Sequence, residues 1–333
     1  MQSDGSRVAR VETETPKDEG PAAVVRACRE AVGEARDKAP GRLGAQVVGI
    51  GISSPGPVDP TRGMVVEPPN LGPAFRNVLL ADDISKSQAG LPAFLERDTN
   101  VAALAEHAFG AARGIDDFIY LTVSTGVGGA VVSGGRLLTG PDGLAGELGH
   151  VPVSMSGPRC GCGGIGHVEA YASGTALARD ARALVASNGS AFLVDRARRI
   201  GGPNELSAKD VAEGALAGDR PCVELMDRAR RAIATACVGY VNAFNPHRIV
   251  VGGSIAEADG ERLLGPIRDA ISREAFEVMA RKVRVVSPAL GADVSLAGAY
   301  PLVIGRLEAG AASRESIAHE SRPAEPAAST SRR

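Results

Sequence analysis

The sequence has no tryptophan, and only 3% of its 333 residues are aromatic, whereas 42 are glycine. This composition favours short strands, tight turns and helices rich in Ala, Leu and Val over an aromatic-rich sheet. Long apolar runs are also missing, since stretches such as 118–123 are far shorter than the roughly 20 apolar residues that span a bilayer. The polar N-terminal segment lacks the apolar stretch of a secretory signal. We therefore expect a soluble, cytoplasmic α/β protein with no membrane partner.

Neither sign of charge dominates the chain. It has 37 basic and 39 acidic side chains, for a formal net charge of −2. No global positive field draws such a protein to nucleic acid, and no basic helix-turn-helix segment is present in the sequence. We expect a small-molecule partner and no nucleic acid. At about 100–200 residues per domain, the length allows two domains.

Short β-rich runs alternate with helical patterns along the chain. Strands are predicted at residues 45–53, 93–96, 118–124, 128–133, 248–251 and 283–287, and helices at 99–110, 169–186, 208–217, 221–244, 261–279 and 299–309. This alternation predicts mixed, largely parallel sheets with helices on their faces. Residues 311–333 contain almost no large apolar side chain and predict a disordered tail.

Two cysteines and two histidines gather in one glycine-rich loop, as His150, Cys160, Cys162 and His167. The chain has five cysteines, which cannot all pair, so ligation suits the two in this loop better than a disulfide. Zinc accepts two thiolates and two imidazoles in a tetrahedral, redox-inert site. The alternative is a pair of unrelated buried cysteines and two surface histidines. We favour a structural zinc site that pins the loop.

Two carboxylates, Glu147 and Glu169, flank this loop. A carboxylate has two acceptor oxygens and can hold a pair of adjacent hydroxyl groups of a polyol. Each could instead be a solvated surface charge, and Glu169 could be a charge at a helix N-terminus. On these residues alone the second interpretation is the simpler one.

Asp98 lies where a predicted strand runs into a predicted helix. Ligands of open α/β sheets bind at the carboxyl ends of strands, so Asp98 could accept a proton from a substrate hydroxyl. The competing interpretation is helix capping, for which Asp is equally well suited. The two roles require different neighbours.

Glycine-rich turns follow two of the predicted strands. The first contains Ser124, Thr125, Gly126, Gly128 and Gly129, whose hydroxyls and accessible backbone N–H groups could bind nucleotide phosphates. It matches neither of the two familiar phosphate-binding fingerprints, and an ordinary β-hairpin is the alternative. The second turn, at Gly252 and Gly253, could lie beside a nucleoside or phosphate.

Taken in this order, the clusters resemble the ROK family of sugar kinases and sugar-responsive repressors, in particular its glucokinase-like members, over roughly residues 1–310. The most specific part is GELGH followed by CGCGGIGHVEAYASG, in which His167 stands where the family usually has a third cysteine. The resemblance implies a two-domain actin-like ATPase (ribonuclease H-like) fold and a homodimer or homotetramer. Its domains would be residues 1–112, joined by a returning helix at about 297–310, and residues 113–296 with the zinc loop.

The same resemblance implies ATP-dependent phosphorylation of a hexose, with glucose to glucose 6-phosphate as the leading reaction and ATP, Mg²⁺ and structural Zn²⁺ as cofactors. Asp98 would be the catalytic base, and the turn at 124–129 would be a phosphate loop. Glu147, His150 and Glu169 would contact the sugar, with His150 also binding zinc. Gly56 and Asn70 fall where family members line the sugar pocket.

Two features depart from the family pattern. Arg97, which with Asp98 is also expected to contact the sugar, replaces the usual Asn before the base. A guanidinium donates hydrogen bonds but cannot accept them, so the pairing with sugar hydroxyls must differ here. The family's opening strands and Asp-x-Gly-Gly-Thr phosphate turn are not found at the start. We therefore expect this chain to be a poor kinase, and the upstream codons to encode the turn. The alternatives are a kinase-impaired sugar-binding or sensing protein, or a kinase for fructose, N-acetylglucosamine or N-acetylmannosamine.

Overall fold

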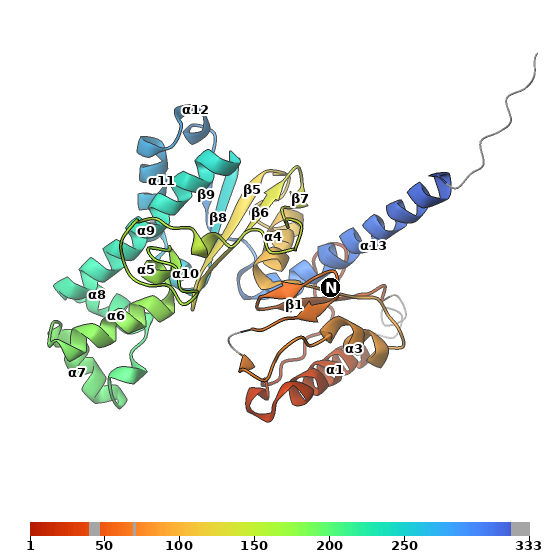
Figure 1. Cartoon of the computed structure of the whole chain (residues 1–333), viewed down its shortest axis with the longest axis horizontal. Coiled ribbons are helices and arrows are strands. Elements are labelled where there is room, and N and C mark those ends of the chain that lie inside the picture. The colour runs from red at the N-terminus through yellow and green to blue at the C-terminus, as the bar shows by residue number, and fades with distance from the viewer. Residues whose placement is uncertain (40–46, 69–70, 321–333) are drawn as a thin grey trace, which may run out of the picture.

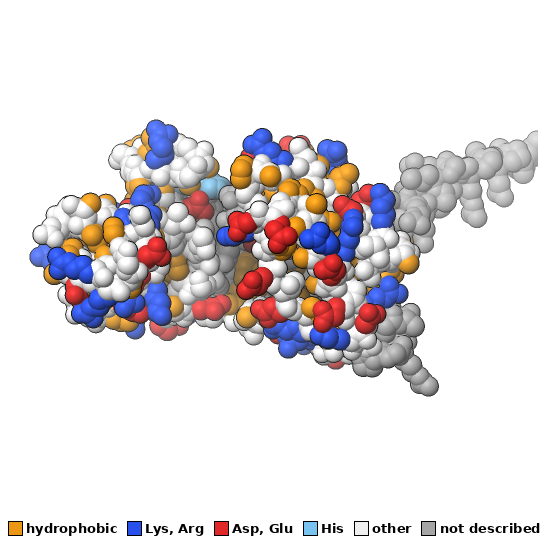
Figure 2. Space-filling model, turned by 90° about the horizontal axis from the view of Figure 1, so that it is seen from below, with side chains coloured by type: hydrophobic (Ala, Val, Ile, Leu, Met, Phe, Trp, Pro, Cys, Tyr) orange, Lys and Arg blue, Asp and Glu red, His pale blue; other side chains and the backbone are white. Residues whose placement is uncertain are grey.

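Strands form two separate groups in the computed structural model, which describes residues 1–39, 47–68 and 71–320. Figure 1 shows these groups in two lobes, with α13 (Val294–Glu320) running from the junction between them along the first lobe. Seen from below, the surface is hollowed between the lobes, as Figure 2 shows. Among the helices of the described ranges, none is long and apolar enough to cross a membrane.

The first lobe contains a short parallel pair of strands, β1 (Ile50–Ser54) and β4 (Ala93–Arg97). An antiparallel pair, β2 (Val58–Asp59) and β3 (Met64–Val65), lies beside it with α1 (Pro21–Asp37), α3 (Leu80–Ser87) and the 3-10 turn η1 (Lys17–Glu19). The predicted strand at 45–53 is thus shorter at its start, and residues 45 and 46 lie outside the described residues, as does Asn70. Burial of apolar side chains holds this lobe together, namely Val24, Val25, Val58, Val65, Phe75, Leu80, Ile84 and Leu95.

The second lobe is built on a five-stranded mixed sheet in the order β7-β6-β5-β8-β9. Its strands are β5 (Phe118–Val123), β6 (Val127–Ser133), β7 (Arg136–Leu137), β8 (Arg248–Gly252) and β9 (Arg284–Val286). The predicted hairpin is confirmed, because β5 and β6 pair antiparallel and leave residues 124–126 as the turn. Strands β8 and β9 continue the sheet in parallel with β5, as the alternation of strands and helices predicted.

Helices cover one face of this sheet and form the largest apolar core of the described residues. The long central one is α9 (Arg220–Phe244), which buries Ile233 and Cys237 against the sheet and its neighbours. The others are α5 (Glu169–Ala172), α6 (Gly174–Ala186), α7 (Ala191–Ile200), α8 (Ala208–Leu216), α10 (Ser254–Asp259), α11 (Glu261–Glu274) and α12 (Glu277–Ala280), with the 3-10 turns η3 (Leu148–His150) and η4 (Pro203–Glu205). A further 3-10 turn, η5 (Gly291–Asp293), lies beside α13 instead.

The helix predicted at 169–186 is interrupted, and this places Glu169 on a short helix of its own. Ser173 adopts an extended backbone conformation between α5 and α6, and its hydroxyl accepts a hydrogen bond from the Ala176 N–H at 3.0 Å. This is the geometry of a helix N-cap, which Ser favours over a mid-helix position. The periodicity of apolar residues did not reveal the break.

Helix α4 (Asp98–Phe109) joins the lobes, because it begins at the end of β4 and packs on the second sheet through Ala102 and Ala103. It also lies against α13, where a Cβ on Gly298 would come within 2.1 Å of the Val101 carbonyl oxygen. The fully buried Glu106 accepts hydrogen bonds from three backbone N–H groups, those of Ala111, Ala289 and Leu290. The junction between the lobes is therefore closely packed and internally bonded.

Helix α13 continues beyond the point where we expected the tail to begin. It runs from Val294 to Glu320, whereas the disordered tail was predicted from residue 311. Ala and Glu are good helix formers and extend a helix that packing has already started, even where large apolar residues are few. Residues 321–333 lie outside the described residues.

Candidate active site and metal centre

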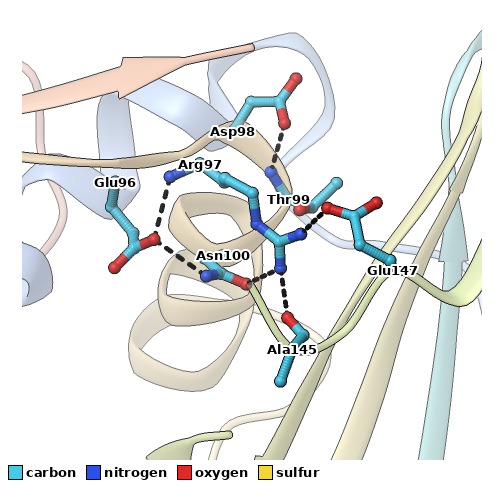
Figure 3. Close-up of polar contacts among 7 residues, drawn as sticks. All are labelled: Glu96, Arg97, Asp98, Thr99, Asn100, Ala145 and Glu147. Carbon is cyan, nitrogen blue, oxygen red and sulfur yellow. Dashed lines mark hydrogen bonds and ion pairs between the residues drawn. The ribbon is translucent and has the colours of Figure 1, made fainter. Parts of the chain in front are cut away.

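Asp98 is the first residue of α4 and lies exposed at the cleft end of β4. Its carboxylate accepts a hydrogen bond from the N–H of the next residue, Thr99, at 2.7 Å (Figure 3). Arg97 holds the N-cap position, so Asp98 does not serve as the cap. This removes the capping interpretation and leaves the side chain available to a ligand.

The surroundings of Asp98 change its acidity in opposing directions. The protein that surrounds the carboxylate on the sides away from the cleft excludes water, and this desolvation raises its pKa. The Thr99 N–H and the Arg97 guanidinium act against the rise, while the charge of Glu147 adds to it. The net result is a pKa above its usual value, as expected for a carboxylate that takes up a proton.

Arg97 connects the end of β4 with the loop that precedes η3. It is 4% exposed, and its Nη1 pairs with Oε1 of Glu147. Its Nη2 donates to the Ala145 carbonyl oxygen at 2.6 Å (Figure 3). Gly56 and Gly146 allow this close approach. A Cβ on Gly56 would lie 3.3 Å from Cδ of Arg97, and a Cβ on Gly146 would lie 3.2 Å from its Nη2. Gly56, predicted in the sugar pocket, therefore lies against the stem of Arg97.

A buried acidic residue, Glu96, anchors this arrangement from below. Its side chain is 1% exposed, and Oε1 accepts hydrogen bonds from the Arg97 N–H at 3.0 Å and the Asn100 amide at 2.9 Å. Its Oε2 pairs with Arg306 of α13 at 3.2 Å. No role was predicted for Glu96, Asn100 or Arg306. An acidic residue at the end of an apolar predicted strand was the available signal for Glu96, but nothing in the sequence pointed to Arg306.

The loop that carries Glu147 is fixed to the second lobe at its far end. The Tyr240 hydroxyl, on α9, donates to the Leu148 carbonyl oxygen at 2.5 Å. Gly149 lies directly on β6, since a Cβ there would be 1.9 Å from the Val127 carbonyl oxygen. Glu147 is thus exposed on a well-held turn, and His150 follows at the end of the same turn.

The structure brings together the four predicted metal ligands. One ligand atom from each of His150, Cys160, Cys162 and His167 lies within 4.8 Å of the others. The ring of His167 fits over Gly164, where a Cβ would come within 2.1 Å of it. Burial raises the pKa of the Cys160 thiol to about 11, and a bound cation would favour the thiolate instead. Two sulfurs and two imidazoles fit a four-coordinate zinc ion.

Glu169 lies between this loop and the turn after β5. Its Oε2 accepts a hydrogen bond from the Val127 N–H at 3.0 Å, and the Cys160 thiol lies 3.5 Å from Oε1. Gly126 makes room for it, because a Cβ on Gly126 would be 2.8 Å from Oε2. The carboxylate therefore links the metal loop to the glycine-rich turn.

The two glycine-rich turns meet at one end of the second sheet. β5 and β8 run parallel with Thr122 opposite Gly252, and the hydroxyls of Ser124 and Ser254 are 2.9 Å apart. Gly253 has a φ of +94°, and a Cβ there would be 2.5 Å from the Val123 carbonyl oxygen. Residues Ser124, Thr125, Gly126, Gly252 and Gly253 thus form one cluster.

Gly128 and Gly129 lie in β6 rather than in the turn. A Cβ on Gly128 would be 2.8 Å from Cγ2 of Thr99, and a Cβ on Gly129 would be 2.6 Å from Leu148. Close packing against α4 and η3 explains the absence of side chains at both positions. Their contact with a nucleotide stays a prediction.

Comparison with known proteins places this site in a family. A model of the ROK family matches residues 1–306. The chain is 37% identical over 307 residues to a glucokinase of Thermotoga maritima, covering 92% of this chain and 93% of the relative. The structure resembles a ROK hexokinase from Thermus thermophilus, with a TM-score of 0.75 and 34% identity over 92% of this chain and 93% of the other.

A second solved structure is a ROK family glucokinase from Streptomyces griseus in complex with glucose and AMPPNP. It matches with a TM-score of 0.71 and 32% identity, over 90% of this chain and 92% of the other. These matches confirm the predicted α/β, actin-like ATPase fold and the resemblance on which it was based. The chain belongs to the ROK family.

Proposed function

We propose that this protein catalyses the ATP-dependent phosphorylation of a hexose, with glucose as the first substrate. The observation that carries the proposal is the position of Asp98, which is exposed at the end of β4 with a raised pKa and lies close enough to Glu147 for the charge of that residue to affect it. The names of the related glucokinases support the choice of substrate. The proposal includes the predicted division into residues 1–112 with 297–310, and residues 113–296.

Asp98 orients the 6-hydroxyl of the sugar and accepts its proton as the oxygen attacks. Its raised pKa makes it a stronger base than a free carboxylate, and the Arg97 guanidinium opposes this rise. Glu147, His150 and Glu169 hold the other hydroxyls, and Gly56 lines the pocket. Positioning of this kind accounts for much of the catalysis of phosphoryl transfer.

The cluster of glycine-rich turns binds the nucleotide phosphates. The Ser124 hydroxyl and the backbone of Thr125 and Gly126 lie at its surface, next to Gly252 and Gly253. The γ-phosphoryl group of bound ATP would pass to the sugar oxygen as its bond to the β-phosphate oxygen breaks and ADP leaves, and Mg²⁺ would neutralise phosphate charge. The protein's share is to fix the phosphates opposite Asp98 and to exclude water from the cleft.

Zinc, held by His150, Cys160, Cys162 and His167, has a structural role in this proposal. A closed set of four protein ligands leaves no open position for substrate. The ion would fix the orientation of His150, three residues from Glu147, and hold Glu169 through its contact with Cys160. The zinc loop therefore shapes one wall of the sugar site.

The test is a coupled assay of ADP formation with glucose, fructose, mannose, N-acetylglucosamine and N-acetylmannosamine, together with calorimetry of each sugar and of ATP. We expect turnover with at least one hexose and binding of both substrates. Sugar binding without ATP binding would reject the kinase and favour a sensor. If no sugar in the panel bound, the sugar site itself would be rejected.

A further inference from the structure

We propose that Arg97 is a positioning residue, which holds the Glu147 carboxylate at the sugar site and makes no contact of its own with the sugar. The inference rests on the proposed function, since it assumes that Glu147 binds sugar hydroxyls. It adds a role for Arg97 that differs from the direct contact expected from the sequence. The support comes from the hydrogen bonds around the guanidinium, drawn in Figure 3.

Both terminal nitrogens of Arg97 bind the protein, whereas Nε has no hydrogen-bond partner among the described residues. Nη1 pairs with Oε1 of Glu147, while Nη2 donates to the Ala145 carbonyl oxygen at 2.6 Å and to Oδ1 of Asn100 at 3.3 Å. The remaining nitrogen, Nε, is buried away from solvent. With its side chain 4% exposed, Arg97 has little surface to offer a ligand.

Glu147 has the opposite character. Its side chain is 48% exposed at the cleft, although Oε1 is held by Arg97. Within residues 1–39, 47–68 and 71–320, no group donates a hydrogen bond to its Oε2. One oxygen is therefore fixed by the protein, and the other is free to accept a hydrogen bond from a sugar hydroxyl.

The network beneath Arg97 determines how the guanidinium is held. Oε1 of Glu96 accepts a hydrogen bond from Nδ2 of Asn100, which turns Oδ1 of that amide towards Arg97. Glu96 also accepts from the Arg97 backbone and is itself paired with Arg306 on α13. The order of contacts runs from α13 through Glu96 and Asn100 to Arg97 and then to Glu147.

This geometry makes Arg97 and Glu147 one unit across the two lobes. Arg97 ends β4 of the first lobe, whereas Glu147 belongs to the turn that Tyr240 holds to the second. Loss of the guanidinium would release Glu147 and leave its negative charge without a partner, close to Asp98. Both effects weaken sugar binding before they affect nucleotide binding.

A double-mutant cycle tests the inference on the full chain. Wild type, Arg97→Ala, Glu147→Gln and the double variant are compared by KM for glucose, KM for ATP, kcat and calorimetric glucose affinity. We expect each single change to weaken glucose binding about tenfold or more, with KM for ATP unchanged. We expect the double variant to equal Glu147→Gln within about twofold, because Arg97 has nothing left to position.

If the losses of glucose affinity in the two single variants multiply in the double variant, then Arg97 makes a sugar contact of its own, and the inference is overturned. Arg97→Lys serves as a second variant in the same cycle, because it keeps the charge but cannot bridge Glu147, Ala145 and Asn100 together. We expect Arg97→Lys to lose less glucose affinity than Arg97→Ala, and to cause no further loss when Glu147→Gln is already present. A further loss in that background would again overturn the inference. Circular dichroism establishes that each variant is folded.

Arg29→Ala is the matched control. Arg29 also has a buried Nε without a hydrogen-bond partner among the described residues, and it pairs with Asp83 in the first lobe, away from the site. We expect its glucose KM to match that of wild type, and a rise as large as that of Arg97→Ala would make the effect structural and reject the inference. If wild-type protein neither binds nor phosphorylates glucose, the proposed function is rejected. If wild type is active but the double-mutant cycle gives multiplied effects, only the inference about Arg97 is rejected.

Discussion

The network around Arg97 and the zinc loop lie at the same candidate sugar site but are held in different ways. In the first, Glu96, Arg97 and Asn100 are buried and joined by hydrogen bonds of 2.9–3.3 Å. In the second, the sulfurs of Cys160 and Cys162 lie 3.6 and 3.3 Å from the rings of His150 and His167, with Cys162 exposed. Hydrogen bonds between side chains hold the first arrangement, whereas in the second the backbone of the loop is hydrogen-bonded and the four side chains offer the donors for an ion.

The side chains of the candidate sugar site are thus held in position in two ways, by buried hydrogen bonds and by a bound ion. A buried network of charged groups is satisfied only when every member is present, so loss of a member lowers stability and, at Arg97, also releases the Glu147 carboxylate. A metal loop is satisfied by the ion, so its loss follows the ion. The proposed base, Asp98, lies beside the first arrangement but outside its hydrogen bonds.

The largest effect is expected for Asp98→Asn, which separates chemistry from stability. Removing a general base should lower kcat by about a hundredfold to ten-thousandfold with little change in glucose affinity. Since desolvation raises the pKa of Asp98, the ionised carboxylate costs stability at neutral pH, and this cost disappears as the pH falls below the raised pKa. The thermal unfolding midpoint at pH 7 should therefore be no lower than that of wild type.

An unchanged kcat in this variant would remove Asp98 from the chemistry. A thermal unfolding midpoint well below that of wild type would show that Asp98 also stabilises the fold. The proposed base and the Arg97 network could then not be treated as separate. Steady-state kinetics and differential scanning calorimetry measure the two properties on the same preparation.

The next effect concerns the zinc loop. Protein purified without added metal should contain about one zinc per chain, and chelation should lower the free energy of unfolding by about 3 kcal/mol or more. Cys160→Ser should reproduce both the metal loss and a weaker glucose affinity, because Glu169 and His150 lose their support.

Cys28→Ser is the control for this loop, since Cys28 is a partly buried cysteine of α1 outside it. We expect full metal content in this variant. Protein that holds no metal, yet keeps its stability and sugar affinity in excess chelator, would show that the loop is self-supporting like the Arg97 network.

A smaller effect is expected for Glu96→Gln, which tests the first region directly. The change leaves an amide group facing Arg306 and removes the charge that the buried network contains. We expect the free energy of unfolding to fall by about 1–3 kcal/mol in urea titration, with zinc content unchanged. The control is Glu67→Gln, whose carboxylate pairs with Arg76 at the surface and should contribute at most about 1 kcal/mol. If the free energy of unfolding falls equally in Glu96→Gln and Glu67→Gln, the buried position of Glu96 adds nothing to its contribution to stability.

Much of this architecture could be predicted from the sequence. The hairpin of β5 and β6, strand β8 and helix α9 came from β-branched runs and apolar spacing, and the four metal ligands came from their density in one loop. The role of Arg306 could not be predicted, because it pairs with Glu96 across 210 residues and no local pattern records such a contact. The extent of α13 was also missed, because the low content of large apolar residues after 310 was given more weight than the helix-forming Ala and Glu of that segment.

The glycines also show how far function can be predicted from sequence. Gly128 and Gly129 were predicted as phosphate contacts, yet the structure gives each a packing reason at Thr99 or Leu148. A glycine in a sequence indicates that a backbone is closely approached, but not by what. Only the fold distinguishes approach by a ligand from approach by a helix or a neighbouring turn.

The smallest effects, and the most discriminating, are opposite shifts in the acid limb of the pH profile of kcat/KM. Asp98 must be ionised to act as a base, so activity falls as the pH drops through its pKa, which lies above the ordinary value of 3.8. Arg97 lowers this pKa and Glu147 raises it, while the Thr99 N–H lowers it in every variant. Arg97→Lys keeps the positive charge and should leave the limb nearly in place, Arg97→Ala should move it to higher pH, and Glu147→Gln should move it to lower pH. Shifts in one common direction would mean that the two substitutions act through a general loosening of the site, and the Arg97 network would then resemble the metal loop rather than contrast with it.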